Sequence, residues 1–142
     1  MFKLFFKKKI VRIVRRRIHN KGARNEYLEH REAARKLVHE KLQYWNQFYN
    51  LEYRKVFIKN TKTKWGSCSS KGNLNFSYKI VFLDPELQDY LIVHELCHIA
   101  EMNHGENFWN LVQQQIPNAK YLHQKLRKCI LPAYGKTSKP RN

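Results

Sequence analysis

Cysteines and long apolar runs are scarce in this chain, and each scarcity excludes a class of protein. The 142 residues include three cysteines, too few and too odd a number for a disulfide framework, which suits a reducing cytoplasm. No apolar run reaches the roughly 20 residues that span a membrane. The apolar stretch at the start is too short for a signal peptide, and no small-residue cleavage site follows it. We therefore expect one small, soluble, cytoplasmic domain.

Acidic residues are also few, and basic residues gather at the start of the chain. There are 11 Asp and Glu against 28 Lys and Arg, which gives a formal net charge of +17. Ten Lys or Arg precede the first acidic residue, Glu26. We distinguish residues 1–24 as a basic N-terminal segment and 131–142 as a short basic tail. Nonspecific, salt-sensitive contact with nucleic acid or anionic lipid is one function of such a segment, and a solvated basic face is the alternative.

The secondary structure of the basic N-terminal segment is left open by its sequence. Its apolar residues suit one face of a helix, and they also suit an edge strand whose charges discourage aggregation. These residues are Ile10, Val11, Val14 and Ile18.

The first half of the following region combines a long helix with two strands. Apolar residues at helical spacing predict a helix over residues 25–49. Apolar residues predict strands at 56–58 and at 74–82, separated by a turn region rich in Ser and Gly. No repeat or internal linker is found, so residues 25–130 are expected to form a single domain.

The second half is predicted to be helical. Asp84 followed by Pro85 is an N-cap and first-position pair that begins a helix. Further helices are expected over 105–116, which Pro117 ends, and over 118–129.

The helix that begins at Pro85 carries the most informative motif, His94-Glu95-Leu96-Cys97-His98. Residues four apart lie on one helix face, so His94 and His98 can hold one ion, in the HExxH pattern of zinc hydrolases. Glu95 is the one formally charged residue in the run 91–100, with His counted as neutral. Burying it beside two histidines would be costly without a compensating charge, whereas a metal makes the arrangement favourable. The motif therefore predicts one Zn(II) ion.

The third ligand is predicted to be His104, six residues after His98. A straight helix would carry a third ligand away from the first two, so the chain must bend. Asn103 and Gly105 flank His104, and both residue types tolerate the left-handed conformation that ends helices. Glu101 is the rival ligand, because it follows His98 by three residues, although a supporting or solvent-facing role is favoured for it.

Three protein ligands leave the fourth zinc position for water, and this predicts catalysis. The ion lowers the pKa of that water from about 15.7 to roughly 7, and Glu95 is placed to take its proton. Cys97 is interpreted as a small core residue. Cys68 is a turn residue in the favoured interpretation, although its thiol could face the site.

At these residues the chain resembles the YgjP-like metallopeptidase domain family, small relatives of the zincin peptidases with distant similarity to SprT-like proteins. The resemblance covers roughly residues 25 to 130. It rests on WGSCSS at 65–70, GNLN at 72–75, VHELCH at 93–98, NH at 103–104 and FW at 108–109.

The resemblance implies a fold and a function. The expected fold is a small zincin-like α+β domain, with a long N-terminal helix, a small mostly antiparallel sheet, the HExxH helix and two C-terminal helices. His94, His98 and His104 would be the zinc ligands, Glu95 the catalytic base, and peptides or proteins the substrates. Family members usually carry a β-rich segment where this chain has a short basic stretch, so a reduced sheet is expected. Glu101 stands where metzincins have glycine, so their fold is not carried over.

Zinc-dependent hydrolysis of peptide bonds is the leading hypothesis, and two alternatives stay open. A metal-dependent nucleotide pyrophosphohydrolase would suit the basic surface, but the chain has no Gly-rich phosphate loop and no set of carboxylates for magnesium. A basic nucleic-acid-binding module with a structural zinc would need a fourth protein ligand and would leave Glu95 without a role.

Three further features concern substrate binding and catalysis. A strand near residues 64–70 is the candidate edge for pairing with an extended substrate. Trp65 either walls the pocket or packs in the core, and packing is favoured. Tyr78, Tyr121 and His123 are candidate oxyanion donors.

Overall fold

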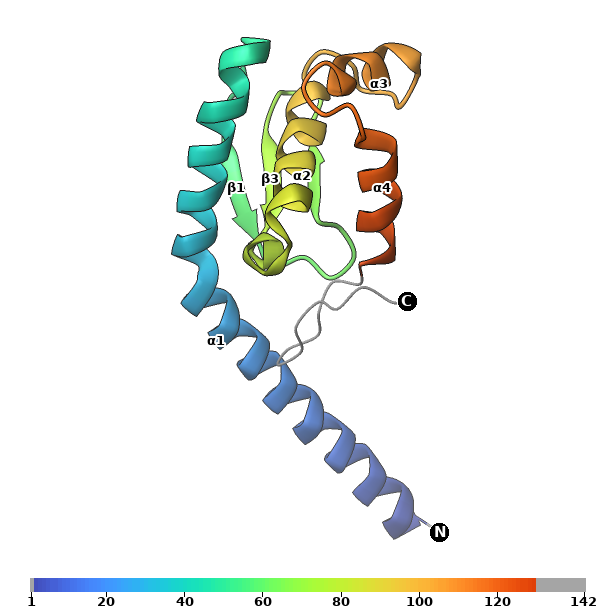
Figure 1. Ribbon diagram of the computed structural model, residues 1–142. Helices are drawn as coiled ribbons and strands as arrows, with labels where there is room; N and C mark the ends of the chain where they lie inside the picture. Colours follow the sequence, from blue (N-terminus) through green and yellow to red (C-terminus); the bar gives the residue numbers. More distant parts are fainter. Residues whose placement is uncertain (1, 130–142) are drawn as a thin grey trace.

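The computed structural model describes the backbone of residues 2–129 and the side chains of residues 20–129. The described chain is α+β, as predicted, with helices packed around a small sheet (Figure 1). In chain order the elements are α1 (Phe2–Tyr49), β1 (Val56–Lys59), β2 (Gly66–Cys68), β3 (Leu74–Ser77), the 3-10 helix η1 (Tyr78–Phe82), α2 (Pro85–Cys97), α3 (Glu106–Gln113) and α4 (Ala119–Lys128). The tail predicted at 131–142 lies outside the described residues.

Helix α1 begins at Phe2 rather than at residue 25, so the basic segment is helical and not an edge strand. Lys and Arg are good helix formers, and proline is absent before residue 25, so charge does not interrupt the helix. The first half of α1 projects beyond the domain, and the second half packs along it (Figure 1). Among the described residues, no helix has the length and apolar character needed to cross a membrane.

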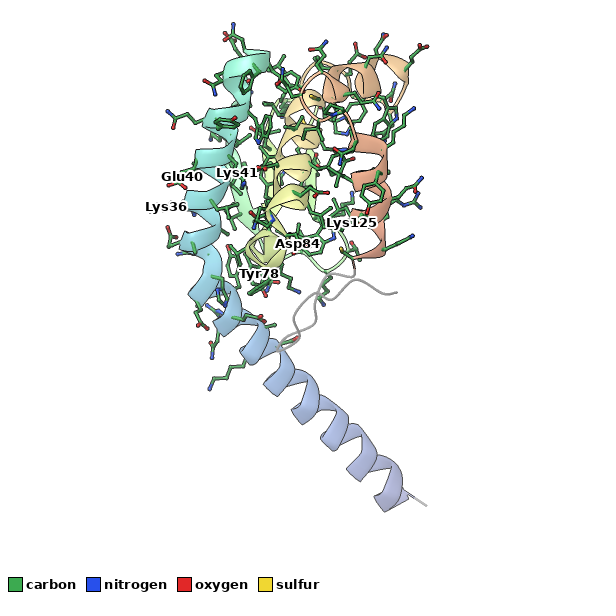
Figure 2. All side chains as sticks on the ribbon, viewed as in Figure 1. Lys36, Glu40, Lys41, Tyr78, Asp84 and Lys125 are labelled. Atoms are coloured by element: carbon green, nitrogen blue, oxygen red, sulfur yellow. The ribbon has the colours of Figure 1, made fainter. Side chains whose placement is uncertain are left out.

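The packed half of α1 presents one face to the core. Ala34, Val38 and Leu42 are fully buried and lie four residues apart, the spacing of one helix face. Lys36 and Glu40 lie on the outward face (Figure 2). Polar groups also join α1 to α2, because Lys41 and the Trp45 indole both donate to the Asp89 carboxylate.

The sheet has three strands in the order β1-β3-β2 and is mixed rather than mostly antiparallel. Strand β3 pairs antiparallel with β2 and parallel with β1. The chain leaves β1, forms β2 at the far edge, and returns through a tight turn, so that β3 fills the middle. That turn contains Gly72 at φ 79°, a left-handed conformation that glycine adopts at no steric cost.

The strand predicted over 74–82 ends at Ser77. The Ser77 hydroxyl accepts a hydrogen bond from the Lys79 amide at 3.3 Å, and η1 begins there. Serine side chains that bond to nearby backbone in this way compete with strand pairing. The apolar residues that follow Ser77 therefore enter the core from a helical turn.

Helix α2 is surrounded by the other elements. It begins at Asp84 and Pro85 as predicted, although the Asp84 side chain makes no capping hydrogen bond. It packs against α1, α3, α4 and β2, so most of its side chains are buried. Cys97 is fully buried, as expected of a small core residue. A helix held on every side is a rigid support for functional groups at its C-terminal end.

Candidate metal centre

Three histidines converge at the C-terminal end of α2. His94 lies in the last turn of α2, His98 follows its end, and His104 lies in the loop before α3. The Nε2 atoms of the three rings form a triangle, at 3.1 Å (His94 to His98), 3.0 Å (His98 to His104) and 3.1 Å (His104 to His94). The three residues expected from the sequence to bind a metal thus lie together and could hold one ion.

The chain returns to the site without the left-handed break expected at Asn103 or Gly105. Ala100 and Glu101 both bond through their amides to the Cys97 carbonyl, at 3.1 and 3.0 Å, which tightens the end of the helix. Gly105 has φ −82° and ψ −173°, an extended conformation. That prediction was wrong because a tightened last turn followed by an extended loop reverses the chain equally well.

Phe108 supports all three imidazole rings. It is fully buried on α3, and its ring stacks on that of His98 with centroids 4.5 Å apart. It meets the rings of His94 and His104 edge to face, at 5.0 and 4.9 Å. Aromatic contacts of this kind limit ring rotation, so Phe108 helps to fix where the three nitrogen atoms point.

Backbone geometry sets the tautomer of His98. Its Nδ1 lies 2.9 Å from the carbonyl oxygen of Glu101, which can only accept, so Nδ1 carries the hydrogen. The lone pair on Nε2 then faces the other two histidines. Glu101 therefore contacts the site through its backbone carbonyl, and its carboxylate is outside the group that converges in the described structure.

A buried tyrosine holds His94 in the same way. The Tyr90 hydroxyl lies 2.8 Å from Nδ1 of His94 and 2.9 Å from Nδ1 of His123, and Tyr90 is fully buried. If Nε2 of His94 is a metal ligand, Nδ1 donates to Tyr90, and the tyrosine donates its one hydrogen to His123. The hydrogen of neutral His123 is then on Nε2. Tyr90 was not predicted from the sequence, where its one signal is its position one turn before His94.

A cation fits the centre of the histidine triangle. Lone pairs that face one another at 3.0–3.1 Å repel, and three nitrogen atoms cannot satisfy one another by hydrogen bonds. Burial, reinforced by His98 and His104, lowers the pKa of His94 to about 3, and burial also lowers the pKa of His98. Protonation is therefore disfavoured. Neutral imidazoles are ligands for zinc, whose tetrahedral sites separate nitrogen atoms by roughly 3.3 Å.

Glu95 lies beside the histidines on α2 and is 5 % exposed. Burial raises the pKa of Glu95 to about 8, and the positive charge of Lys64 acts in the opposite direction. The side chain packs on the backbone of β2, where Gly66 has no Cβ to obstruct it. A carboxyl group with this pKa can both accept and release a proton near neutral pH.

The buried charge of Glu95 should make the stability of the metal-free protein depend on pH. The unfolded chain releases this proton near pH 4.5, whereas the folded chain holds it to about pH 8, so stability falls as pH rises through that window. Glu95→Gln does not titrate. We expect the metal-free variant to gain stability over wild type between pH 5 and 8, on the order of a few kcal/mol. Urea unfolding in the presence of a chelator measures this, and a constant difference across pH would contradict it.

Gly66 should not tolerate a side chain, because Glu95 occupies the space beside it. A Cβ at Gly66 would lie 3.0 Å from both Cγ and Oε1 of Glu95 and 3.1 Å from the Asn75 carbonyl oxygen. We expect Gly66→Ala to lower the free energy of unfolding by about 1–3 kcal/mol and to displace the carboxylate. Gly105→Ala is the control, since the added carbon would meet no atom within 4 Å apart from those of residue 105 and its two chain neighbours. Equal denaturant midpoints for the two variants would refute this packing.

A cavity of about 480 Å³ opens beside His94 and Glu95. Its lining comes from the loop between β1 and β2, from α2 and from α4. Trp65 forms one wall of the cavity. It is also buried and donates its indole hydrogen to the Cys129 carbonyl at 3.3 Å, so it packs in the core as well. Burial and then Glu95 raise the pKa of the Cys68 thiol to about 11, which disfavours the thiolate that metals bind.

The three candidate oxyanion donors lie in different places. His123 lines the cavity and its ring stacks on that of His94, with centroids 5.8 Å apart. Tyr78 is buried against Tyr27 near the start of α2 (Figure 2), at the other end of that helix from the histidines. Tyr121 is 61 % exposed and does not line the cavity. Of the three, His123 is the one that lies at the site.

Tyr90→Phe should weaken metal binding without changing the fold, because it removes one hydroxyl and keeps the ring. Loss of the partner that orients a ligating histidine typically costs 10–100-fold in metal affinity, and we expect a loss of about that size. Competition with a chromophoric chelator measures the zinc affinity. The exposed Tyr44 on α1 gives a matched control, Tyr44→Phe. Equal affinities for the two variants would show that Tyr90 does not orient His94.

Comparison with known proteins identifies relatives. The family model described as YgjP-like, metallopeptidase domain, matches residues 6–129. The metallopeptidase zymogen abylysin of Pyrococcus abyssi has a similar fold, with 23 % identity, a TM-score of 0.57, and coverage of 63 % of this chain and 90 % of that one. The jannalysin zymogen of Methanocaldococcus jannaschii is 27 % identical with a TM-score of 0.49, covering 66 % and 92 %. No curated protein sequence matches.

The family match extends over nearly the whole described chain. It includes the histidine triangle, Glu95 and the cavity, and it begins within the basic segment of α1. The fold likeness to abylysin agrees with it. The chain therefore belongs to the YgjP-like metallopeptidase family.

Proposed function

We propose that the protein is a zinc-dependent peptidase in which His94, His98 and His104 hold one zinc ion and Glu95 is the general base. The observation that carries the proposal is the convergence of three Nε2 atoms, 3.0–3.1 Å apart, beside a buried carboxyl group at a cavity. Membership of a metallopeptidase family supports the reaction class.

The residues divide the chemistry among them. Zinc, when bound, supplies a water of lowered pKa and polarises the scissile carbonyl. A carboxylate oxygen of Glu95 accepts the proton of the attacking water and later returns it to the departing amine. The Glu95 pKa of about 8 in the absence of metal is suited to holding that proton between the two steps.

His123 is our candidate for stabilising the oxyanion. Tyr90 occupies Nδ1 of His123, which leaves the Nε2 hydrogen to donate to another group. His123 lines the cavity next to His94 and Glu95, where the negative charge of the transition state would develop. A donor aimed at that charge contributes strongly to catalysis in a site of low dielectric.

Strand β2 is our candidate for binding the substrate backbone. It is an edge strand, because among the described residues it pairs only with β3. Gly66 of β2 also lines the cavity beside Glu95. An extended peptide can add to such an edge through main-chain hydrogen bonds, which would bring its scissile bond to the histidines.

The geometry of the same site bears on the alternative functions, a structural zinc and nucleotide hydrolysis. A structural zinc would need a fourth protein ligand, and the group that converges in the described residues has three. Nucleotide hydrolysis would suit basic side chains at the cavity, but the family is a metallopeptidase one. Nonspecific nucleic-acid binding by residues 1–24 stays a separate prediction, to be measured as salt-dependent affinity.

Incubation of the zinc-loaded protein with a diverse peptide library, followed by mass spectrometry, tests the proposal. We expect cleavage by wild type and none by Glu95→Gln. A parallel incubation with nucleoside triphosphates tests the pyrophosphohydrolase alternative. Intact peptides together with cleaved nucleotides would overturn the peptidase proposal.

A further inference from the structure

The cavity beside the candidate metal centre has an uneven charge distribution. Among the described residues, three cationic side chains line it, namely Lys62, Lys64 and Arg127, and Glu95 is the one carboxylate in that part of the lining. The proposed chemistry uses Glu95 and the histidines, and it gives these three cations no role.

The cations come from separate parts of the chain and face the same space. Lys62 and Lys64 lie in the loop before β2, and Arg127 lies in the last turn of α4. The cavity lies between them, with His94 and Glu95 supplied by α2. A charged group that entered the cavity would therefore meet positive charge from two sides.

The three cations have no ion-pair partner among the described residues, and all three are exposed. Their charges do reach the site, because Lys64 and Arg127 line the same cavity as Glu95 and His123. Unpaired cations around a concave site focus a positive potential into it and attract anionic ligands.

The potential should discriminate among peptides. A carboxylate next to the scissile bond would gain attraction from Lys62 and Arg127, while a lysine or arginine in the same place would be repelled. The volume of about 480 Å³ is large enough for a side chain. Guanidinium groups also bind carboxylates through paired hydrogen bonds, which suits Arg127 as the main contact.

We propose that this cavity is a specificity pocket for a carboxylate of the peptide substrate, with Lys62 and Arg127 as its specificity-determining residues. The inference rests on the proposed peptidase function. The carboxylate can come from an Asp or Glu side chain near the cleaved bond, or from the C-terminus of a peptide. Both sources offer the same charge and hydrogen-bond acceptors.

The test compares peptides that differ at one position. Peptides with Glu, Gln or Lys flanking the cleaved bond, each with a free or amidated C-terminus, are cleaved by the zinc-loaded protein and quantified by mass spectrometry. We expect kcat/KM to be about tenfold higher for Glu than for Gln, with the ratio falling as salt screens the charges. A preference for Glu that persists among the amidated peptides identifies a substrate side chain as the source of the carboxylate. A preference for free over amidated peptides identifies the C-terminus as the source.

Charge reversal in α4 supplies the matched variants. Arg127→Glu should abolish or invert the ratio of the kcat/KM values for Glu and Lys peptides. Lys128→Glu is the control, because Lys128 is the next residue of the same helix and does not line the cavity. A similar loss of preference in both variants would overturn the proposal, since it would show a general charge effect. Equal cleavage of all peptides by wild type, free or amidated, would overturn it as well.

A binding measurement separates failure of the pocket from failure of the peptidase. The same peptides, labelled with a fluorophore, are titrated with zinc-loaded Glu95→Gln protein and followed by anisotropy. Suppose that wild type cleaves no peptide, while peptides with Glu or with a free C-terminus still bind tenfold tighter than the others. The pocket then stands and the peptidase proposal fails. If binding shows no preference, or if only inorganic phosphate competes, the carboxylate assignment is wrong.

Discussion

Glu95→Gln is expected to leave the fold and the metal in place while lowering peptide turnover by at least about a hundredfold. General acid–base catalysis contributes typically 10²–10⁴-fold, and Glu95 is the one carboxyl group among the described residues that line the cavity beside the histidines. Glutamine has nearly the same shape but cannot accept the proton of the attacking water. The expected loss is therefore in kcat, with KM little changed, because both side chains fill the same space against Gly66.

Metal content and turnover must be measured together for that result to mean anything. Atomic absorption after dialysis gives zinc per chain, and initial rates on a cleaved library peptide give kcat and KM. Zinc bound at one ion per chain with turnover lost supports Glu95 as the base. Retained turnover would refute it, and loss of zinc would instead assign Glu95 a role in forming the site.

The candidate metal centre could be predicted because most of its information is local. His94 and His98 are four residues apart, so any helix over this region places them on one face. The absence of other charged residues from 91 to 100 indicated burial, and α2 is indeed buried on most sides. His104 was predictable as a returning residue, although the route of its return was not.

Contacts that depend on how two helices pack could not be predicted from the sequence. Tyr90 lies on α2 and His123 on α4, and their hydrogen bond depends on how the two helices pack. Arg127 reaches the cavity for the same reason. One cation among 28 Lys and Arg carries no signal of its own until α4 is placed beside α2.

The predictions of the fold were wrong where several local conformations have similar energies. The full length of α1 was missed because the apolar residues of its first half suit a helix face and an edge strand equally, so hydrophobic spacing did not decide between the two. The order of the strands also depends on long-range pairing. Connection lengths did not indicate that β3 would lie between β1 and β2 and make a mixed sheet.

His104→Ala is expected to remove the metal while Glu101→Ala keeps it. These residues were the two rival third ligands, and both can be changed at little cost to the core, since His104 is exposed and Glu101 is only half-buried. Loss of Nε2 of His104 opens the triangle, and we expect zinc affinity to fall by more than the roughly 10–100-fold typical of supporting residues. Alanine at 101 retains the backbone carbonyl that fixes His98.

Thermal unfolding with and without zinc measures this difference without needing an active substrate. Metal at 100 times its Kd adds about 2.7 kcal/mol to the stability of the folded state, so wild type and Glu101→Ala should both gain several degrees in Tm. His104→Ala should gain almost nothing at the same zinc concentration. The reverse result, a shift for His104→Ala and none for Glu101→Ala, would make the Glu101 carboxylate the third ligand, and the loop after His98 would then have to rearrange on binding the ion.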